Sequence, residues 1–147
     1  MVLYRALDSA GNTLDFLLNA SRSRRAAKRF FRKVLAGQHV TPSRVINVDK
    51  NPSYIGAVRD LKREKLLTEG CKRRPSQYMN NIIEQDHRFL KRRIRPGLGF
   101  FSYPTAWRTI RGSEAMHMIR KGQVRGAKKR NVKAQNQFIA GLFGLAG

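Results

Sequence analysis

Glu84 is the first ionisable residue that is well placed for chemistry. It lies near the start of segment 80–96, which is predicted to form a helix that Pro96 ends. Glu84, Arg88 and Lys91 recur four and three positions apart and therefore share one helix face, beside an apolar stripe with helical spacing. One interpretation is a solvent-exposed Glu–Arg pair, which stabilises a helix by only about 0.2–0.5 kcal/mol. The other is an acid of a functional site, and the helix alone favours the first interpretation.

A second carboxylate upstream changes that balance. Asp49 follows a short β-branched run that starts at Arg44, so it is predicted to lie at the carboxyl end of a strand. Ligands of α/β proteins bind at this end of the strands. Thirty-four residues, positions 50 to 83, separate Asp49 from Glu84. The pair therefore favours a functional site over a solvated helix.

These segments resemble the catalytic motifs of a known family. Val45-Ile-Asn-Val-Asp-Lys50 and Asn80-Asn-Ile-Ile-Glu-Gln-Asp-His-Arg88, with the spacing between them, resemble the segments around the second and third acids of a DDE transposase. In particular, they look like the bacterial insertion-sequence-six family, within the retroviral integrase superfamily. Lys91, seven residues after the glutamate, matches the basic residue of that signature. The resemblance extends from Leu3 to Ile139 and so covers nearly the whole chain.

The resemblance implies a DNA-processing site that uses two divalent cations, Mg²⁺ or Mn²⁺, about 3.5–4 Å apart. Carboxylates suit Mg²⁺ because this hard ion prefers oxygen ligands. Asp49 and Glu84 are the implied catalytic residues and metal ligands, and Lys91 is implied to contact the DNA end. Helix geometry suggests further phosphate contacts from three arginines, Arg88, Arg92 and Arg95.

The resemblance also implies the fold, an α/β protein with an RNase H-like five-stranded mixed sheet and helices on both faces. In that fold the first strand carries the first catalytic aspartate and lies in the middle of the sheet. Its neighbours would here be the strands at 2–7 and 44–48. The family's first aspartate is expected upstream of Leu3, and the chain begins at Met1. We therefore expect this chain to lack the central first strand and one of three catalytic carboxylates.

These inferences lead to one functional hypothesis with two alternatives. The chain is expected to be an N-terminally truncated transposase, inactive alone, from a family that performs metal-dependent DNA strand cleavage and transfer at insertion-sequence ends. Residues 1–120 would be the partial catalytic domain and 121–147 a basic tail with a short apolar helix. The expected partners are DNA, as transposon ends and target, and further copies in a homo-oligomer of the intact family. The alternatives are a non-catalytic DNA-binding remnant or regulator of transposition, and an unrelated basic nucleic-acid-binding protein.

The composition agrees with a nucleic-acid partner. The 147 residues include 31 Lys and Arg against 9 Asp and Glu, a formal net charge of +22, which indicates a polyanionic partner. A membrane surface is the weaker choice, because the cations occur in every segment and no apolar window reaches transmembrane length. No signal peptide is recognisable and Cys71 is the only cysteine, so we expect a cytoplasmic, nucleoid-associated protein. The three histidines lie too far apart in the sequence to indicate a zinc site.

Hydrophobic spacing and turn residues predict the remaining elements. In chain order these are a hairpin of strands at 2–7 and 13–18, a helix from about 24 to 35, a helix from 52 to about 64, a long helix from 104 and a short apolar helix within 135–145. Between 70 and 77 a polar connector is expected, because Pro75 is unfavourable in a central strand. Phe101 and Trp107 are expected in the core, and 121–133 is expected to be solvated.

Three other charged features are assigned structural roles. Asp8 starts a turn whose backbone its side chain can bond, and Asp15 lies opposite the apolar face of its strand. Neither is therefore expected in an active site. The helix at 24–35 is expected to have a solvated cationic face, part of which could contact DNA. The cations of that face are Arg24, Arg25, Lys28, Arg29, Arg32 and Lys33.

Overall fold

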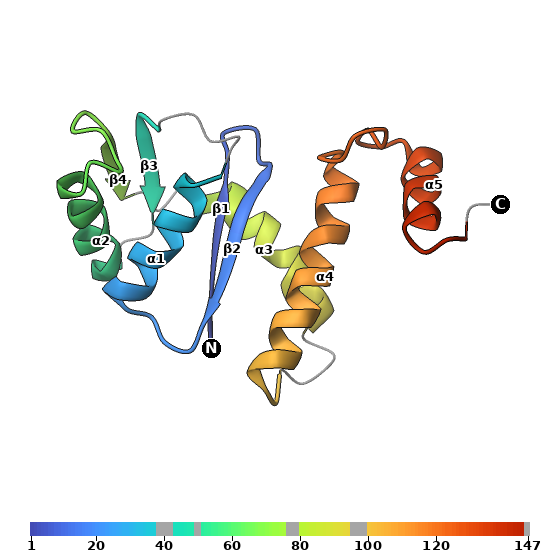
Figure 1. Cartoon of the computed structure of the whole chain (residues 1–147), viewed down its shortest axis with the longest axis horizontal. Coiled ribbons are helices and arrows are strands. Elements are labelled where there is room, and N and C mark those ends of the chain that lie inside the picture. Colours follow the sequence, from blue (N-terminus) through green and yellow to red (C-terminus); the bar gives the residue numbers. More distant parts are fainter. Residues whose placement is uncertain (38–42, 49–50, 76–79, 95–99, 146–147) are drawn as a thin grey trace. The chain divides into compact units, whose positions relative to one another are not determined.

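The computed structural model describes residues 1–37, 43–48, 51–75, 80–94 and 100–145, with the backbone alone described for 75, 80–84, 93 and 94. The chain divides into two compact units, Met1–Phe89 and Leu90–Gly147, and each is described here by itself. The elements, in chain order, are β1 Val2–Leu7, β2 Thr13–Asn19, α1 Arg24–Leu35, β3 Val45–Val48, α2 Pro52–Arg63, β4 Lys72–Pro75, α3 Asn80–Ile94, α4 Tyr103–Lys121 and α5 Val132–Leu142 (Figure 1). The predicted α/β class is thus confirmed as five helices with two small sheets in the part of the chain described.

β1 and β2 form the predicted antiparallel hairpin, with Val2 opposite Asn19 and a register shift near Leu7. Asp8 builds the turn, since its carboxylate accepts hydrogen bonds from the backbone N–H groups of Ala10 at 2.9 Å and Asn12 at 2.8 Å. Burial alone would raise the pKa of the Asp8 carboxyl, but the hydrogen bonds from Asn12, Ala10 and neighbouring backbone groups hold that pKa below its usual value. The turn role predicted for this residue is confirmed.

β3 and β4 form a separate parallel pair, in which Val45 lies opposite Lys72 and Val48 opposite Pro75. The expectation of a connector in place of a strand is therefore wrong for Lys72–Pro75. A proline is unfavourable inside a sheet because it lacks an N–H donor. Here it occupies the last position of the ladder, in a two-stranded sheet whose strands both lie at an edge. Only the pairing with β3 reveals that this position tolerates it.

Two helices complete the core of the first unit. α1 is capped by the Ser23 hydroxyl, which accepts a hydrogen bond from the Ala26 N–H, and α2 is capped by the Asn51 side chain. The buried apolar residues come from both sheets as well as both helices, and the rings of Tyr4 and Phe30 lie 5.6 Å apart, centroid to centroid. The core members are Tyr4, Ala26, Ala27, Phe30, Phe31, Val34, Val48, Ala57, Val58, Leu61, Leu67 and Cys71.

The hairpin is covered on both faces. Tyr4 of β1 contacts Phe30 of α1, while the next residue, Arg5, contacts Asp86 of α3. Successive strand residues point to opposite faces, so α1 and the part of α3 around Asp86 lie on opposite sides of the hairpin (Figure 1). This explains why Leu18 of β2 is buried even though it lies outside the main core.

The second unit is built on α4, which begins at the Ser102 cap with Pro104 in its first turn. Its buried residues are Ala106, Ile110, Glu114 and Ile119. The predicted core position of Trp107 is wrong, because its side chain is 36% exposed and the Arg111 guanidinium lies 4.9 Å from the ring centroid. Phe101, also predicted in the core, is 98% exposed. At this turn of α4 the buried residue is Ala106 rather than Trp107.

Candidate functional site

The two predicted catalytic acids lie at the limits of what the structure describes. Asp49 lies outside the described residues, directly after the buried end of β3 at Val48. Glu84 belongs to α3, whose backbone is described at that position and whose side chain is not. The predicted strand and helix are therefore confirmed, whereas the approach of the two carboxylates stays a prediction. Within the described ranges, no group of three or more His, Cys, Asp or Glu residues could hold a metal ion.

Three of the four cations predicted to contact DNA lie on the same helix, α3. Arg88, Lys91 and Arg92 are exposed on α3, and Leu90 between them is buried at 2% exposure. The predicted division of the helix into an apolar and a cationic face is therefore confirmed for these four residues. Arg95 lies outside the described residues. Three exposed cations within little more than one helical turn are suited to contacts with phosphate oxygens.

A buried ion pair ties α3 to the hairpin, and the sequence analysis missed it. The Arg5 Nη2 atom lies 2.6 Å from the Asp86 Oδ2 atom, and the two side chains are 0% and 8% exposed. Asp86 lies two residues after Glu84 within the same motif. A visible signal was Arg5 itself, a cation in the middle of an apolar strand. Its partner could not be identified, because 81 positions separate the two residues (86 minus 5).

The cationic face of α1 makes ion pairs that the sequence analysis did not predict. Lys28 and Arg32 both bind the Glu64 carboxylate of α2, the latter at 2.8 Å. The hydrogen bonds from these two side chains hold the pKa of the Glu64 carboxyl below its ordinary value. This part of the face therefore links α1 to α2. Five of the six cations are exposed, so the predicted solvated face is confirmed, with ion pairs that the prediction did not include.

Two further pairs complete this network. The Arg24 Nε atom lies 2.8 Å from the Asp60 Oδ2 atom, and the Arg24 hydrogen bond lowers the pKa of the Asp60 carboxyl. The Lys33 Nζ atom lies 2.8 Å from the Asp15 Oδ1 atom of β2. Four of the six α1 cations thus have carboxylate partners. Among the acidic residues whose side chains the structure describes, Asp8, Asp15, Asp60, Glu64 and Asp86 thus have structural roles.

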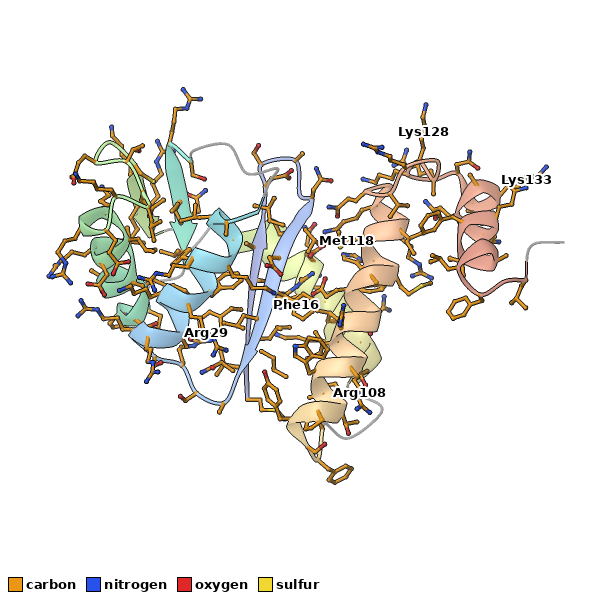
Figure 2. The ribbon with its side chains drawn as sticks, viewed as in Figure 1. Phe16, Arg29, Arg108, Met118, Lys128 and Lys133 are labelled. Carbon is orange, nitrogen blue, oxygen red and sulfur yellow. The ribbon has the colours of Figure 1, made fainter. Side chains whose placement is uncertain are left out.

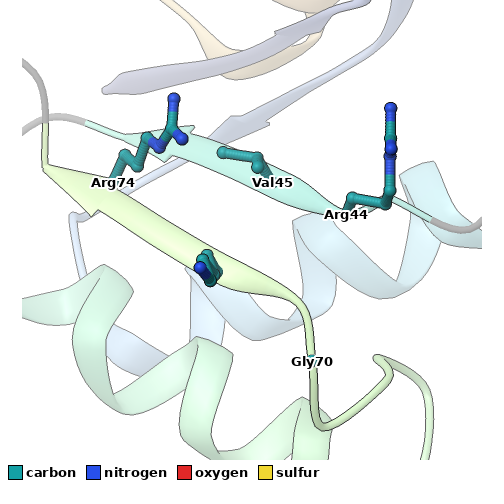
Figure 3. Close-up of a pocket in the computed structure, with 5 residues that line it drawn as sticks. Arg44, Val45, Gly70 and Arg74 are labelled. Carbon is teal, nitrogen blue, oxygen red and sulfur yellow. The ribbon is translucent and has the colours of Figure 1, made fainter.

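An open concavity beside β3 and β4 is lined by basic side chains. Its lining residues are Arg44, Val45, Gly70, Lys72 and Arg74. Figure 3 shows the Arg44 and Arg74 side chains extending to the same side of the strand pair. Because all three charged lining residues are cations, the concavity favours an anion such as a phosphate group. It is open rather than enclosed and offers no nucleophile or acid of its own.

Comparisons with known proteins bear on these residues. A family model described as a DDE domain matches residues 1–123. The transposase for insertion sequence-like element IS431mec of Staphylococcus aureus is 36% identical over 120 residues, which cover 81% of this chain and 50% of the relative. The transposase for insertion sequence element IS257 in transposon Tn4003, also from Staphylococcus aureus, gives the same identity and coverage.

A third relative is shorter. An uncharacterized protein of Yersinia pseudotuberculosis is 37% identical over 76 residues, which cover 51% of this chain and 71% of that protein. The chain spans about half the length of the curated transposases it matches. No solved structure matches it. Among the helices that the structure describes, none is long and apolar enough to cross a membrane.

Proposed function

Because the chain belongs to the DDE transposase family, as its motifs predicted, we propose that it is the catalytic part of a transposase that cleaves and joins DNA strands at insertion-sequence ends. The observation that carries this proposal is the family match over residues 1–123, which includes both acidic motifs. The order of elements agrees with it, since one motif contains β3 and the other opens α3. The substrates would be the transposon ends and the target DNA.

The proposed metal ligands are Asp49 and Glu84. Their carboxylate oxygens are the donor type that Mg²⁺ or Mn²⁺ prefers, so the residues present fit the pair of divalent cations that the family implies. When bound, such ions supply charge neutralisation at the attacking and leaving oxygens. Lys91, Arg88, Arg92 and Arg95 would bind phosphates of the same DNA end. The buried Arg5–Asp86 pair would hold the helix that carries Glu84 against the hairpin.

We propose an RNase H-like sheet for the whole protein. The antiparallel β1–β2 pair and the parallel β3–β4 pair share one core but are not hydrogen-bonded to each other within the residues described. A strand between β1 and β3 would join them into a five-stranded mixed sheet. The helices on both faces of the hairpin support the same arrangement. Such a strand is where the family's first catalytic aspartate would lie.

The 147 residues on their own are proposed to be inactive in strand transfer. The motif match supplies two of the three carboxylates that the family uses, and a site with one ligand fewer has less charge compensation for its metal ions. Asp8 is the nearest acid to the expected third position, and its carboxylate is occupied by the turn. For the whole protein we also propose that it forms the homo-oligomers of its family and that it is located at the nucleoid.

A second candidate function is a DNA-binding remnant or regulator of transposition. The observation that favours it is the net charge of +22, together with exposed cations on α3 and beyond. Such a protein would occupy transposon ends, or mix into oligomers of an active transposase, without cleaving DNA. Only an activity measurement separates it from the first candidate.

The test is a strand-transfer assay in Mg²⁺ or Mn²⁺ with DNA of the terminal sequences that flank the gene. The 147-residue protein is compared with a version extended upstream by an aspartate-bearing strand. We expect transfer by the extended version only, abolished by Asp49→Asn or Glu84→Gln. Glu69→Gln is the matched control, since Glu69 is exposed and outside both motifs. Transfer by the short version that Asp8→Asn abolishes would overturn the proposed site.

Binding without transfer in either version would favour the second candidate. Circular dichroism of each variant shows whether a loss of transfer reflects a loss of fold. The thermal stability of the extended version, measured during a metal titration, reports metal binding without any strand transfer. We expect Mn²⁺ to raise the melting temperature of the extended version and to raise it less after Glu84→Gln.

A further inference from the structure

The segment that joins α4 to α5 concentrates positive charge. We call residues 120–133 the basic turn; seven of its fourteen residues are Lys or Arg, and no Asp or Glu follows Glu114 in the sequence. All of these cations except Lys121 are exposed. They are Arg120, Lys121, Arg125, Lys128, Lys129, Arg130 and Lys133. The segment itself therefore contains no acidic side chain beside these cations.

The sequence predicts a solvated tail here, but the structure shows a built turn. α4 ends at Gly122, whose φ of 75° is the left-handed conformation that favours glycine. The N–H groups of Gly122 and Gln123 bond the carbonyls of Ile119 and Met118 at 2.9 and 3.0 Å. A Cβ atom added at Gly122 would lie 2.3 Å from the Lys129 backbone nitrogen. The two limbs of the basic turn therefore pack directly against each other.

Hydrogen bonds of the backbone and of polar side chains close the turn. Val124 and Ala127 form an isolated antiparallel bridge, and Ala127 is fully buried. The buried Gln135 side chain donates from Nε2 to the Lys128 carbonyl at 2.9 Å. Asn131 caps α5 through a hydrogen bond from the Ala134 N–H. The conformation of the turn is thus set by groups other than its charged side chains.

Figure 2 shows Lys128 and Lys133 extending outward from the turn and from the start of α5. Cations held close together repel one another, and this repulsion is relieved when a polyanion binds between them. A binding surface that is already ordered loses less conformational entropy on association than a disordered tail. A preformed cluster of cations is therefore suited to a chain of closely spaced phosphates.

We propose that the basic turn is a preformed surface for the phosphate backbone of duplex DNA. A membrane surface fits less well, because interfacial helices carry Lys and Arg along one face, whereas α5 carries a single cation, Lys133. Residues 124–133, which contain five of the seven cations, lie beyond the range of the family match, so the matched domain does not account for this part of the surface. The proposal does not depend on strand transfer, and DNA binding through the turn could fail or succeed whatever the outcome of the transfer assay.

The first test compares two triple variants of the whole 147-residue protein, each of which lowers the net charge by three. One replaces Lys128, Lys129 and Lys133 by Gln. The matched control replaces Arg59, Lys65 and Arg108 by Gln, exposed cations that belong to none of the surfaces predicted to contact DNA. Binding to a fluorescent duplex of about 20 base pairs is measured by anisotropy over a range of salt concentrations.

We expect the turn variant to bind at least about tenfold more weakly at roughly 0.1 M salt, because each lost phosphate contact removes about 0.9 from the slope of log K against log salt. Three contacts predict a decrease of about 2–3 in the magnitude of that slope. The control variant should change the slope by less than about 1. Equal losses in the two variants would overturn the proposal, since net charge alone would then explain the binding.

The second test alters the shape of the turn without changing its charge. Gly122→Ala places a Cβ atom against the Lys129 backbone and should weaken DNA binding severalfold. Gly112→Ala is the control, because a Cβ at that position of α4 meets nothing within 4 Å. Unchanged affinity in the Gly122 variant would overturn the role of the preformed shape.

The third test identifies the polyanion. Anionic phospholipid vesicles and an RNA duplex of matched length compete with the labelled DNA. We expect the DNA duplex to compete most strongly, and the difference to disappear in the Lys128, Lys129 and Lys133 variant. Vesicles that compete better than DNA would assign the turn to a membrane surface. RNA that competes better would assign it to RNA, and either outcome would overturn the proposal for DNA.

Discussion

α1 and the basic turn are equally rich in cations, because Lys and Arg make up half of the residues in each. They differ in what surrounds those cations. On α1, Lys28 and Arg32 meet Glu64, and Arg24 meets Asp60. Residues 115–147, which include most of the second unit and the whole basic turn, contain no Asp or Glu. The comparison teaches that cation density does not decide the role of a basic segment, because carboxylates brought by other elements do.

The same comparison separates two kinds of acidic residue. The carboxylates that meet α1 hold two helices together, and the Asp86 carboxylate holds α3 to β1. These residues are part of the scaffold. Asp49 and the Glu84 side chain lie outside what the structure describes, and the chemical role of both residues is a proposal. Each of the predictions below tests whether a charged residue belongs to the scaffold or to a binding surface.

The largest effect is expected for the buried pair. Asp86→Asn leaves the Arg5 guanidinium buried opposite a neutral group, and removal of one partner of a buried ion pair costs about 3–5 kcal/mol of unfolding free energy. Urea unfolding of the variant and the natural chain measures this. The double variant Arg5→Met, Asp86→Leu should recover much of the loss, because two apolar side chains replace both charges. A loss below about 1 kcal/mol in the single variant would show that water reaches the pair.

A smaller effect is expected from acid. The carboxyl groups of Asp60 and Glu64 have pKa values below their ordinary values of 3.8 and 4.5 in the folded chain. Their contribution to stability is therefore fully present above those ordinary values, and it is lost as the pH falls through the lower folded values. Unfolding midpoints measured between pH 7 and pH 2 should fall as the pH drops below about 4.5.

Glu64→Gln is the control for this prediction, because it removes one titrating group and keeps the size of the side chain. Its unfolding midpoint should depend less on pH than that of the natural chain. Asp8 contributes in the same direction, since its pKa is lowered as well. The basic turn has no carboxylate of its own to titrate in this range. A Glu64→Gln variant with an unchanged pH profile would show that the Lys28 and Arg32 contacts add nothing to stability.

The exposed pair between Lys33 and Asp15 is expected to matter less. Half of the Lys33 side chain is exposed, and exposed pairs contribute about 0–1 kcal/mol because water and salt screen them. Lys33→Gln should therefore lower the unfolding free energy by less than about 1 kcal/mol, and by less still in high salt. A loss as large as that of Asp86→Asn would remove the distinction between buried and exposed pairs.

The smallest effect on stability is expected in the basic turn. Replacement of Lys128, Lys129 and Lys133 by Gln removes exposed side chains that stabilise nothing by burial, so the unfolding free energy should change by within about 0.5 kcal/mol per site. A slight increase is the expected sign, because repulsion between neighbouring cations is reduced. Marked destabilisation would show that these lysines support the fold, as the paired cations of α1 do.

The sequence by itself determined the local elements and the family. Ser23 before an apolar-periodic segment, Asp8 before a glycine-containing turn and Pro104 near a helix start all act on neighbouring residues, and the structure confirms each of them. The acidic motifs were recognisable for a related reason, since both are continuous stretches of the chain. The spacing between the two motifs can be counted in the sequence without knowledge of the contacts that they make.

Only the tertiary structure decided which residues distant in the sequence contact one another. The partner of Arg5, the exposure of Phe101 and the carboxylates that meet α1 all depend on residues distant in the sequence. The strand that ends at Pro75 exists because β3 pairs with it. The basic turn is ordered because Gly122 lets the Lys129 backbone approach. Local patterns set how each segment folds, but contacts between distant segments set the surroundings of each charge, and those surroundings decide whether it supports the fold or binds a partner.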